Sequence, residues 1–195
     1  MKRLVVMVSG FGSNLQAIMD ACRRGEIQGQ VVAVFANRKA GLERAREAGI
    51  DAVYRPLKPF KGSPDPRAAY DEALARDVAV YKPDFVILAG WMRILTPAFL
   101  RPFGNRVINL HPALPGHFAG THAIERAFAA WQDGQIEHTG VMVHRVVEEV
   151  DAGPVLATAV VPFEPGDSLE RLAERVHKTE HRILVEAIAG LCAPT

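Results

Sequence analysis

Short apolar runs alternate with amphipathic segments along the first half of the chain. The near-continuous β-branched runs at residues 3–8 and 30–35 predict two buried strands. Between them, apolar residues recur at helical spacing over residues 15–22, which predicts a helix and therefore a βαβ unit. We expect Ser13 or Asn14 to cap this helix, because their side-chain oxygens can accept hydrogen bonds from its free N–H groups.

The same alternation continues to the middle of the chain. Helical patterns and strand patterns follow in turn, separated by a segment rich in Pro, Lys and Gly that is typical of a loop. The predicted elements are a helix at 42–48, a strand at 52–54, the loop at 56–66, a helix at 67–81 and a strand at 84–89. Strands and helices that alternate in this way predict a parallel sheet.

The second half alternates less regularly. It predicts a strand at 106–110, a Pro- and Gly-rich loop at 111–120, a helix capped by Thr121, and strands at 139–147 and 154–161. Asp167 and Glu170 form a capping-box pattern that predicts the start of a long last helix. The fold class predicted is α/β, a Rossmann-like, mostly parallel, open twisted sheet with helices on both faces, in one domain over residues 1–195.

Composition and charge exclude several classes of protein. Of the 195 residues, 49% are hydrophobic and 23% are charged, as in an ordinary globular protein. The formal net charge of +1 provides no global basic field for nucleic acid or an anionic membrane, and no apolar run approaches the ~20 residues that span a bilayer. Cys22 and Cys192 form no CxxC pair, so we expect free thiols in a reducing cytoplasm.

The glycine-rich segment at residues 9–14, Ser-Gly-Phe-Gly-Ser-Asn, lies where the first strand turns into the first helix. Backbone N–H groups and the helix dipole converge at such a turn, which predicts a phosphate site. A third glycine near Leu15 and an acidic residue after the second strand are both missing, which argues against NAD. A tight turn that uses glycine for geometry alone explains this motif equally well.

Asn109 and His111 lie at the carboxyl end of a predicted strand, where period-two alternation sends both side chains to one side. Asp151 lies in a turn from which it can reach over the same end of the sheet. Each residue alone also fits a structural role, as a packed histidine or a turn-forming aspartate. The other histidines of this half lack metal-ligand spacing and are interpreted as packing or solvent-facing residues: His117, His122, His138 and His144.

Six segments together carry a family resemblance: SGFGSNLQAI, VFANRKAGLERAREAGI, AGWMRILTPAFL, NLHPALPG, TGVMVHRV and VDAGPVL. In this order, and covering nearly the whole chain, they resemble the glycinamide ribonucleotide formyltransferase family of folate-dependent enzymes. The Asn-x-His pair with Asp indicates the use of 10-formyltetrahydrofolate, whereas the SGxGSN motif and the chain length indicate the acceptor. The loop after His111 reads HPALPGHFAG where the family commonly has HPSLLPxxPG, so its shape is left open.

The resemblance implies transfer of a formyl group from 10-formyltetrahydrofolate to the amine of glycinamide ribonucleotide, the third step of de novo purine biosynthesis, in the cytoplasm and without a metal. The implied catalytic residues are Asn109, His111 and Asp151. The implied ribonucleotide-binding residues, mostly in the N-terminal half, are Gly12, Ser13, Asn14 and Glu180. The implied folate-binding residues are Arg67, Met92, Arg93, Ile94, Leu95 and Asn109.

The reaction passes through a tetrahedral oxyanion, which needs hydrogen-bond donors. We expect the Asn109 amide and a protonated His111 to hold this oxygen. Asp151 is expected to keep His111 protonated by pairing with it, and to relay a proton from the amine.

Other functions stay open at this point. A methionyl-tRNA formyltransferase or a formyltetrahydrofolate hydrolase uses the same folate but is expected to be longer. A non-catalytic nucleotide-binding module would need only the glycine loop, and the co-occurrence of Asn109, His111 and Asp151 argues against it. The expected partners are the two small-molecule substrates, with a monomer and a homodimer both possible.

Overall fold

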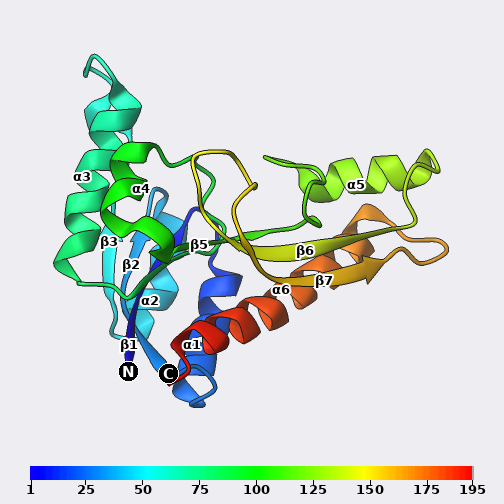
Figure 1. Ribbon diagram of the computed structural model, residues 1–195, viewed down its shortest axis with the longest axis horizontal. Helices are drawn as coiled ribbons and strands as arrows, with labels where there is room; N and C mark the ends of the chain where they lie inside the picture. Colours follow the sequence, from blue (N-terminus) through cyan, green and yellow to red (C-terminus); the bar gives the residue numbers. More distant parts are fainter. Residues whose placement is uncertain (195) are drawn as a thin grey trace.

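A seven-stranded sheet in the order β3-β2-β1-β4-β5-β6-β7 forms the centre of the computed structural model, which describes residues 1–194 (Figure 1). The strands are β1 Lys2–Val8, β2 Gly29–Ala36, β3 Asp51–Tyr54, β4 Phe85–Leu88, β5 Val107–His111, β6 His138–Arg145 and β7 Val155–Pro162. The first five strands pair in parallel, whereas β6 is antiparallel to both β5 and β7. The prediction of a mostly parallel sheet is therefore confirmed.

Helices cover both faces of this sheet, as predicted. They are α1 Ser13–Arg23, α2 Glu43–Glu47, α3 Pro66–Val80, α4 Pro97–Phe103, α5 Ala123–Gln132 and α6 Leu169–Cys192, with short 3-10 turns η1 Lys39–Leu42, η2 Lys58–Phe60 and η3 Gly104–Arg106. Among residues 1–194, no helix is both long enough and apolar enough to cross a membrane.

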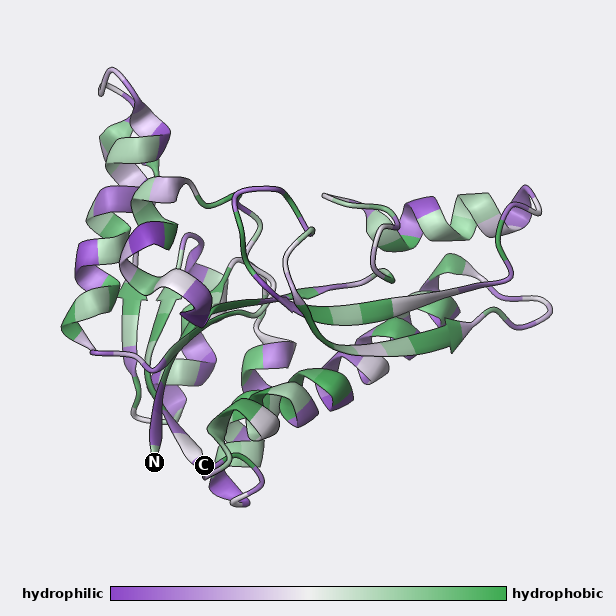
Figure 2. Ribbon diagram, in the orientation of Figure 1, coloured by the Kyte–Doolittle hydropathy of each residue, from purple (hydrophilic) through white to green (hydrophobic). Residues whose placement is uncertain are grey.

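Two apolar cores lie on the two sides of the sheet. On β1, Leu4 and Val6 point into the core that contains α1 and α6, while Val5 and Met7 point into the core that contains α3 and α4. This division follows from the period of two along a strand. A parallel strand that is buried on both faces must be apolar throughout, which is why residues 3–8 read as a near-continuous run. Figure 2 shows this hydrophobic colouring along the strands between the helix layers.

The predicted helix caps are wrong at three places. Gly12, in the left-handed region at φ 78°, precedes α1, and neither Ser13 nor Asn14 makes a side-chain cap. His122, not Thr121, precedes α5. The last helix is capped by the Ser168 hydroxyl, which accepts from the backbone N–H of Arg171.

Asp167 accepts hydrogen bonds from the Arg175 guanidinium and from the backbone N–H of Glu164, so its carboxylate is already engaged. Side chains with several available partners compete for the same helix end, and sequence spacing alone does not decide which one wins. Helix α4 was not predicted at all, because Pro97 at its start and Pro102 inside it conceal the helical pattern.

The strand order places a topological switch point between β1 and β4, because the chain moves outward from β1 in opposite directions. In open α/β sheets, ligands bind in the crevice at the carboxyl ends of such strands. Here the loops after β1 and β4 are tied together. The N–H of Ser9 donates to the Gly90 carbonyl at 3.0 Å, and the Ser9 hydroxyl accepts from the N–H of Met92 at 2.8 Å.

Candidate active site

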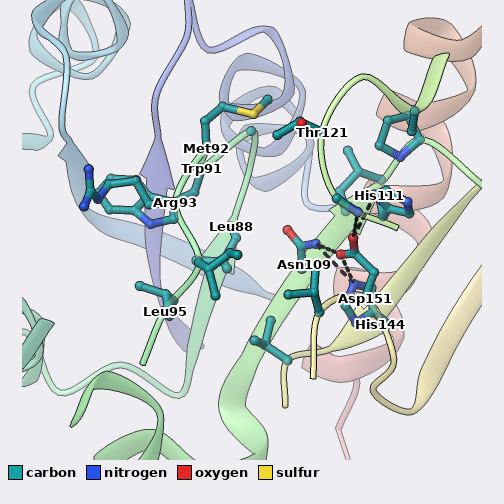
Figure 3. A pocket seen from close by; sticks show the side chains of 18 of the residues that line it. Leu88, Trp91, Met92, Arg93, Leu95, Asn109, His111, Thr121, His144 and Asp151 are labelled. Atoms are coloured by element: carbon teal, nitrogen blue, oxygen red, sulfur yellow. Dashed lines mark hydrogen bonds and ion pairs between the residues drawn. The ribbon is translucent and has the colours of Figure 1, made fainter. Parts of the chain in front are cut away.

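A cavity of about 400 Å³ lies at the carboxyl ends of β4 and β5, next to the switch point. Its volume is within the range of ~300–1,000 Å³ that is usual for small-molecule sites. Asn109 and His111 enter it from β5, His144 enters from β6, and Asp151 reaches in from the turn before β7 (Figure 3). The structure therefore brings together the three residues that the sequence singled out.

Asp151 lies at the centre of this group. Its Oδ2 accepts from the N–H of Gly120 at 2.8 Å, and its Oδ1 accepts from the Asn109 amide at 3.3 Å. Nδ1 of His111 and Nε2 of His144 each lie 3.4 Å from one of its oxygens. Asp151 has a positive φ of 54°, a conformation that Asp and Asn adopt more readily than most other non-glycine residues.

The environment of Asp151 keeps its carboxylate ionised. Burial raises its pKa, but the hydrogen bond from the Gly120 N–H, together with the positive charge that the nearby His111 and His144 can carry, outweighs this effect. The net result is a pKa below the usual value of 3.8. At neutral pH the cavity therefore contains one buried negative charge beside two imidazoles.

The pKa of His111 is lowered from 6.5, chiefly because burial disfavours the imidazolium, and the nearby Asp151 only partly offsets this. This shift favours the neutral ring at pH 7, contrary to the expectation that Asp151 keeps it protonated. Nε2 is buried without a hydrogen-bond partner among residues 1–194. Nδ1 lies 3.4 Å from the ionised Asp151, which only accepts, so the hydrogen of the neutral ring is on Nδ1.

His144, which was interpreted as a packing or solvent-facing residue, belongs to the site. Its side chain is only 2% exposed. Its Nδ1 lies 2.9 Å from the carbonyl oxygen of Arg145, and its Nε2 lies 3.1 Å from the amide nitrogen of Asn109. The one signal in the sequence was a histidine directly after the apolar run at residues 140–143. The pairing of β6 with β5 could not be predicted from it.

Asn109 is oriented by these contacts. A carbonyl oxygen only accepts, so Nδ1 of His144 carries a hydrogen, and Nε2 is the ring nitrogen that can accept from Asn109. One amide hydrogen of Asn109 therefore points to His144 and the other to Asp151, while Oδ1 is turned toward the cavity (Figure 3). While these two contacts are made, neither hydrogen is free for an oxyanion, contrary to the expectation.

The segment at residues 92–95, which the resemblance implies to bind the folate, forms one wall of the cavity. Met92 and Ile94 are largely exposed, with relative accessibilities of 69% and 55%. Helix α3 fixes the segment from behind. The buried Asp71 accepts from the N–H of Thr96 at 2.6 Å, and the Arg67 guanidinium donates to the Ile94 carbonyl at 3.2 Å.

Arg67 itself is not among the residues that line the cavity. The predicted ribonucleotide-binding residues also lie outside it: Gly12, Ser13, Asn14 and Glu180. They form a second, adjoining group, linked to the cavity through the contacts of Ser9 with Gly90 and Met92.

Within this second group, Asn14 of α1 and Glu180 of α6 are both buried and meet across the two helices. The Asn14 amide donates to Oε2 of Glu180 at 3.4 Å, and Nδ1 of His177 lies 2.9 Å from the same oxygen. The neighbouring carboxylate raises the pKa of His177 above 6.5. Oδ1 of Asn14 is buried and has no partner among residues 1–194, so a polar acceptor is left for a ligand.

Among residues 1–194, the His, Cys, Asp and Glu side chains form no group of three or more that could hold a metal ion. Cys22 is half-buried and Cys192 is buried, and both are free. Burial raises the pKa of both thiols, that of Cys192 to about 11, so neither is a reactive thiolate at neutral pH.

Known proteins resemble this chain over almost all of its length. The family model described as Formyl transferase matches residues 2–188. A phosphoribosylglycinamide formyltransferase of Schizosaccharomyces pombe is 49% identical over 195 residues, covering 95% of this chain and 94% of that protein. One from Escherichia coli is 45% identical over 182 residues, with coverages of 92% and 82%.

A solved structure gives the same result for the fold. The glycinamide ribonucleotide transformylase 1 of Symbiobacterium toebii superposes with a TM-score of 0.90 at 41% sequence identity. The match covers 98% of this chain and 88% of that one.

Proposed function

This chain belongs to the formyl transferase family, among its phosphoribosylglycinamide formyltransferases, and we propose that it transfers the formyl group of 10-formyltetrahydrofolate to the amine of glycinamide ribonucleotide. The observation that carries this proposal is the meeting of Asn109, His111 and Asp151 in one cavity beside the glycine loop. The transfer serves purine biosynthesis, and both co-substrates are small molecules.

The two substrates meet at the boundary between the two groups of residues. The glycine loop, with Gly12, Ser13 and Asn14, is proposed to bind the ribonucleotide phosphate through backbone N–H groups at the start of α1. Glu180 binds the same substrate through its carboxylate oxygens. In this position, the amine of the ribonucleotide points across the switch point toward Asn109 and His111.

The folate is proposed to occupy the 400 Å³ cavity against Met92, Arg93, Ile94 and Leu95, with Asn109 at its inner end. The mostly apolar wall suits a flat heterocycle, and the backbone groups of this segment offer hydrogen bonds to its edge. Arg67 at the outer end of the segment is available to the acidic tail of the folate.

The chemical step requires that the attacking amine lose one proton while the formyl oxygen becomes an anion. The ionised Asp151 is suited to take up that proton, directly or through water, as the new C–N bond forms. His111, whose Nδ1 lies 3.4 Å from Asp151, can donate its Nδ1–H to the oxyanion. The proton then moves to N10 of the folate as the bond between N10 and the formyl carbon breaks.

Asn109 supplies the second donor. One amide hydrogen stays on His144, and the other, whose contact with Asp151 is long at 3.3 Å, is proposed to move to the oxyanion as charge develops. Donors of this kind are typically worth about 3 kcal/mol each in the transition state. The expected role of Asn109 and His111 is thus retained, with the initial protonation state of His111 changed.

We further propose that the protein acts in the cytoplasm as one formyltransferase domain over residues 1–195, with no metal, and as either a monomer or a homodimer. The N-terminal half mainly binds the ribonucleotide, and the C-terminal half mainly holds the folate and the catalytic residues.

The test is to incubate the pure protein with 10-formyltetrahydrofolate and glycinamide ribonucleotide and follow the folate product by absorbance. We expect a product only when both substrates are present. Release of formate without the ribonucleotide would indicate a hydrolase instead. Transfer to methionyl-tRNA but not to the ribonucleotide would indicate a tRNA formyltransferase. If no acceptor reacts, the protein is a non-catalytic nucleotide-binding module.

A further inference from the structure

The segment that follows β2 packs closely against the glycine loop at residues 9–14. A Cβ on Gly41, in η1, would lie 2.7 Å from the Gly10 carbonyl oxygen and 2.5 Å from a methyl carbon of Val8. Contacts this short do not occur, so only glycine allows η1 to approach the loop so closely. Helix α2 follows at once, and its first turn therefore lies beside the loop.

Arg44, on this helix, reaches the loop directly. Its Nε donates to the carbonyl oxygen of Phe11 at 2.8 Å, and its Nη1 donates to the Gln16 side-chain oxygen at 3.2 Å. Its Cδ lies 3.5 Å from the position that a Cβ on Gly12 would occupy. The side chain thus extends along the flank of the loop, from the residue before Gly12 to the first turn of α1.

Both acceptors of Arg44 are neutral. Within the described residues 1–194, no Asp or Glu oxygen lies within ion-pair distance of this guanidinium. The same is true of Arg106, which donates only to carbonyl oxygens, but Arg44 is the one of the two that lies against the glycine loop. Half-buried charges are usually paired, because removing them from water has a cost. An unpaired guanidinium held in place beside an anion site indicates that the missing partner is an anionic ligand.

The loop itself lacks a cation. Residues 9–14 contain no basic side chain, and the first turn of α1 offers only the partial charge of the helix dipole. A phosphate monoester carries nearly two negative charges at neutral pH. Backbone N–H groups position such a group, and a nearby guanidinium would supply the full charge that they do not.

We propose that Arg44 is a binding residue for the substrate phosphate. It pairs with the phosphate, and by holding the Phe11 carbonyl it turns the negative end of that peptide away from the anion. The inference rests on the proposed function, in which the glycine loop holds a phosphorylated substrate.

The test compares Arg44→Gln, Arg44→Lys and the control Arg46→Gln in steady-state kinetics. Arg46 lies two residues further along the same helix, is exposed and makes no side-chain hydrogen bond or ion pair within residues 1–194. A charge-assisted hydrogen bond is worth ~1.5–3 kcal/mol, so Arg44→Gln should raise KM for glycinamide ribonucleotide roughly ten- to a hundredfold. KM for the folate and kcat should change less than about twofold, the variation expected of a surface substitution.

Arg44→Lys keeps the charge but loses the forked contact with Phe11 and Gln16, and it should recover part of the loss. Circular dichroism and thermal unfolding show whether the variants fold. If Arg44→Gln and Arg46→Gln have the same KM for the ribonucleotide, the inference is wrong. It is also wrong if Arg44→Gln weakens both substrates equally.

A second measurement separates this inference from the proposed function. Calorimetry with ribose 5-phosphate reports on the phosphate site without any formyl transfer. Binding to the wild type that is lost in Arg44→Gln but kept in Arg46→Gln supports the role of Arg44, even if no formyl transfer is found. Binding that does not depend on Arg44, or no binding to the wild type, contradicts it.

Discussion

Asn109 and His144 face each other across β5 and β6, with the Asn109 amide nitrogen 3.1 Å from Nε2 of His144. His144 is fixed in turn, because its Nδ1 lies 2.9 Å from the Arg145 carbonyl oxygen. A backbone carbonyl thus selects the tautomer of His144, and this tautomer selects the orientation of the Asn109 amide. His144 is therefore a positioning residue for Asn109.

We expect His144→Ala to lower kcat about tenfold or more while KM for either substrate changes little. The variant leaves the Asn109 amide without its acceptor, so the amide can rotate and the donor is no longer preorganised. Steady-state kinetics with both substrates varied in turn gives the measurement.

His138 provides the matched control, because it lies on the same strand but is exposed. His138→Ala should behave like the wild type. If His144→Ala lost thermal stability but kept its kcat, His144 would be a packing residue, as the sequence first indicated.

His111→Ala and Asn109→Ala should each lower kcat by roughly a hundredfold, the usual effect of removing one donor worth about 3 kcal/mol. Both side chains line the cavity, so the fold should survive. Single-turnover kinetics would place the loss in the chemical step. Near-normal turnover in either variant would remove that residue from the oxyanion site.

Gly12→Val should weaken the ribonucleotide far more than the folate. Gly12 has φ 78°, and a Cβ there would meet only ordinary contacts at 3.5 and 3.6 Å. The damage therefore comes from the left-handed backbone, which costs a branched residue about 1–2 kcal/mol, and from methyl groups beside the anion.

Gly25 is the control for this backbone effect, since it has φ 76° at the other end of α1 and a Cβ placed there would have no atom within 4 Å. Gly25→Val should lose similar stability without a change in ribonucleotide affinity. Calorimetry measures the affinity of each variant for the ribonucleotide and for the folate. An equal loss of affinity for both substrates in Gly12→Val would indicate a general folding defect.

The alternation of apolar runs was sufficient to predict the sheet, because β1 from Leu4 to Val8 and most of β2 from Val31 to Ala36 are buried on both faces and are apolar throughout. Helix ends were harder to predict. Gly12 starts α1 by taking a positive φ, a property of the chain's path between strand and helix that side-chain capping rules do not capture.

The part of the site that lies on a single strand could be predicted from the sequence. Asn109 and His111 share a face because they are two residues apart, and both were found. His144 and Arg44 were missed because their roles depend on contacts between elements: β6 beside β5, and α2 beside the glycine loop. The protonation state of His111 depends on how deeply it is buried, which spacing does not reveal.

The ion pair of His177 with Glu180 should stabilise the fold only at low pH. The pKa of His177 is raised above 6.5 in the folded protein, so its contribution is complete below pH 6.5 and is lost as the pH rises through the raised value. His177→Gln should therefore reduce the free energy of unfolding at pH 5.5 more than at pH 8.5. Because the histidine is 54% exposed, the difference should be small.

Urea unfolding at the two pH values provides the measurement. His138→Gln, which removes an exposed histidine with no ion pair in the described residues, should show no such difference. A His177→Gln effect that is the same at both pH values would mean that the contact is not ionic.

Asp151→Asn should fold normally, because Asn also adopts the positive φ that Asp151 has, yet lose nearly all of its activity with the charge. In the wild type, activity should fall as the pH drops through the lowered pKa of Asp151, since the ionised carboxylate is the proposed proton acceptor. Asn does not titrate, so this acid limb should be absent from the residual activity of the variant. The amine of the substrate titrates alike in both enzymes, so comparing their profiles isolates the effect of Asp151. A variant with substantial activity and an unchanged limb, shown to be folded by circular dichroism, would leave Asp151 a turn former.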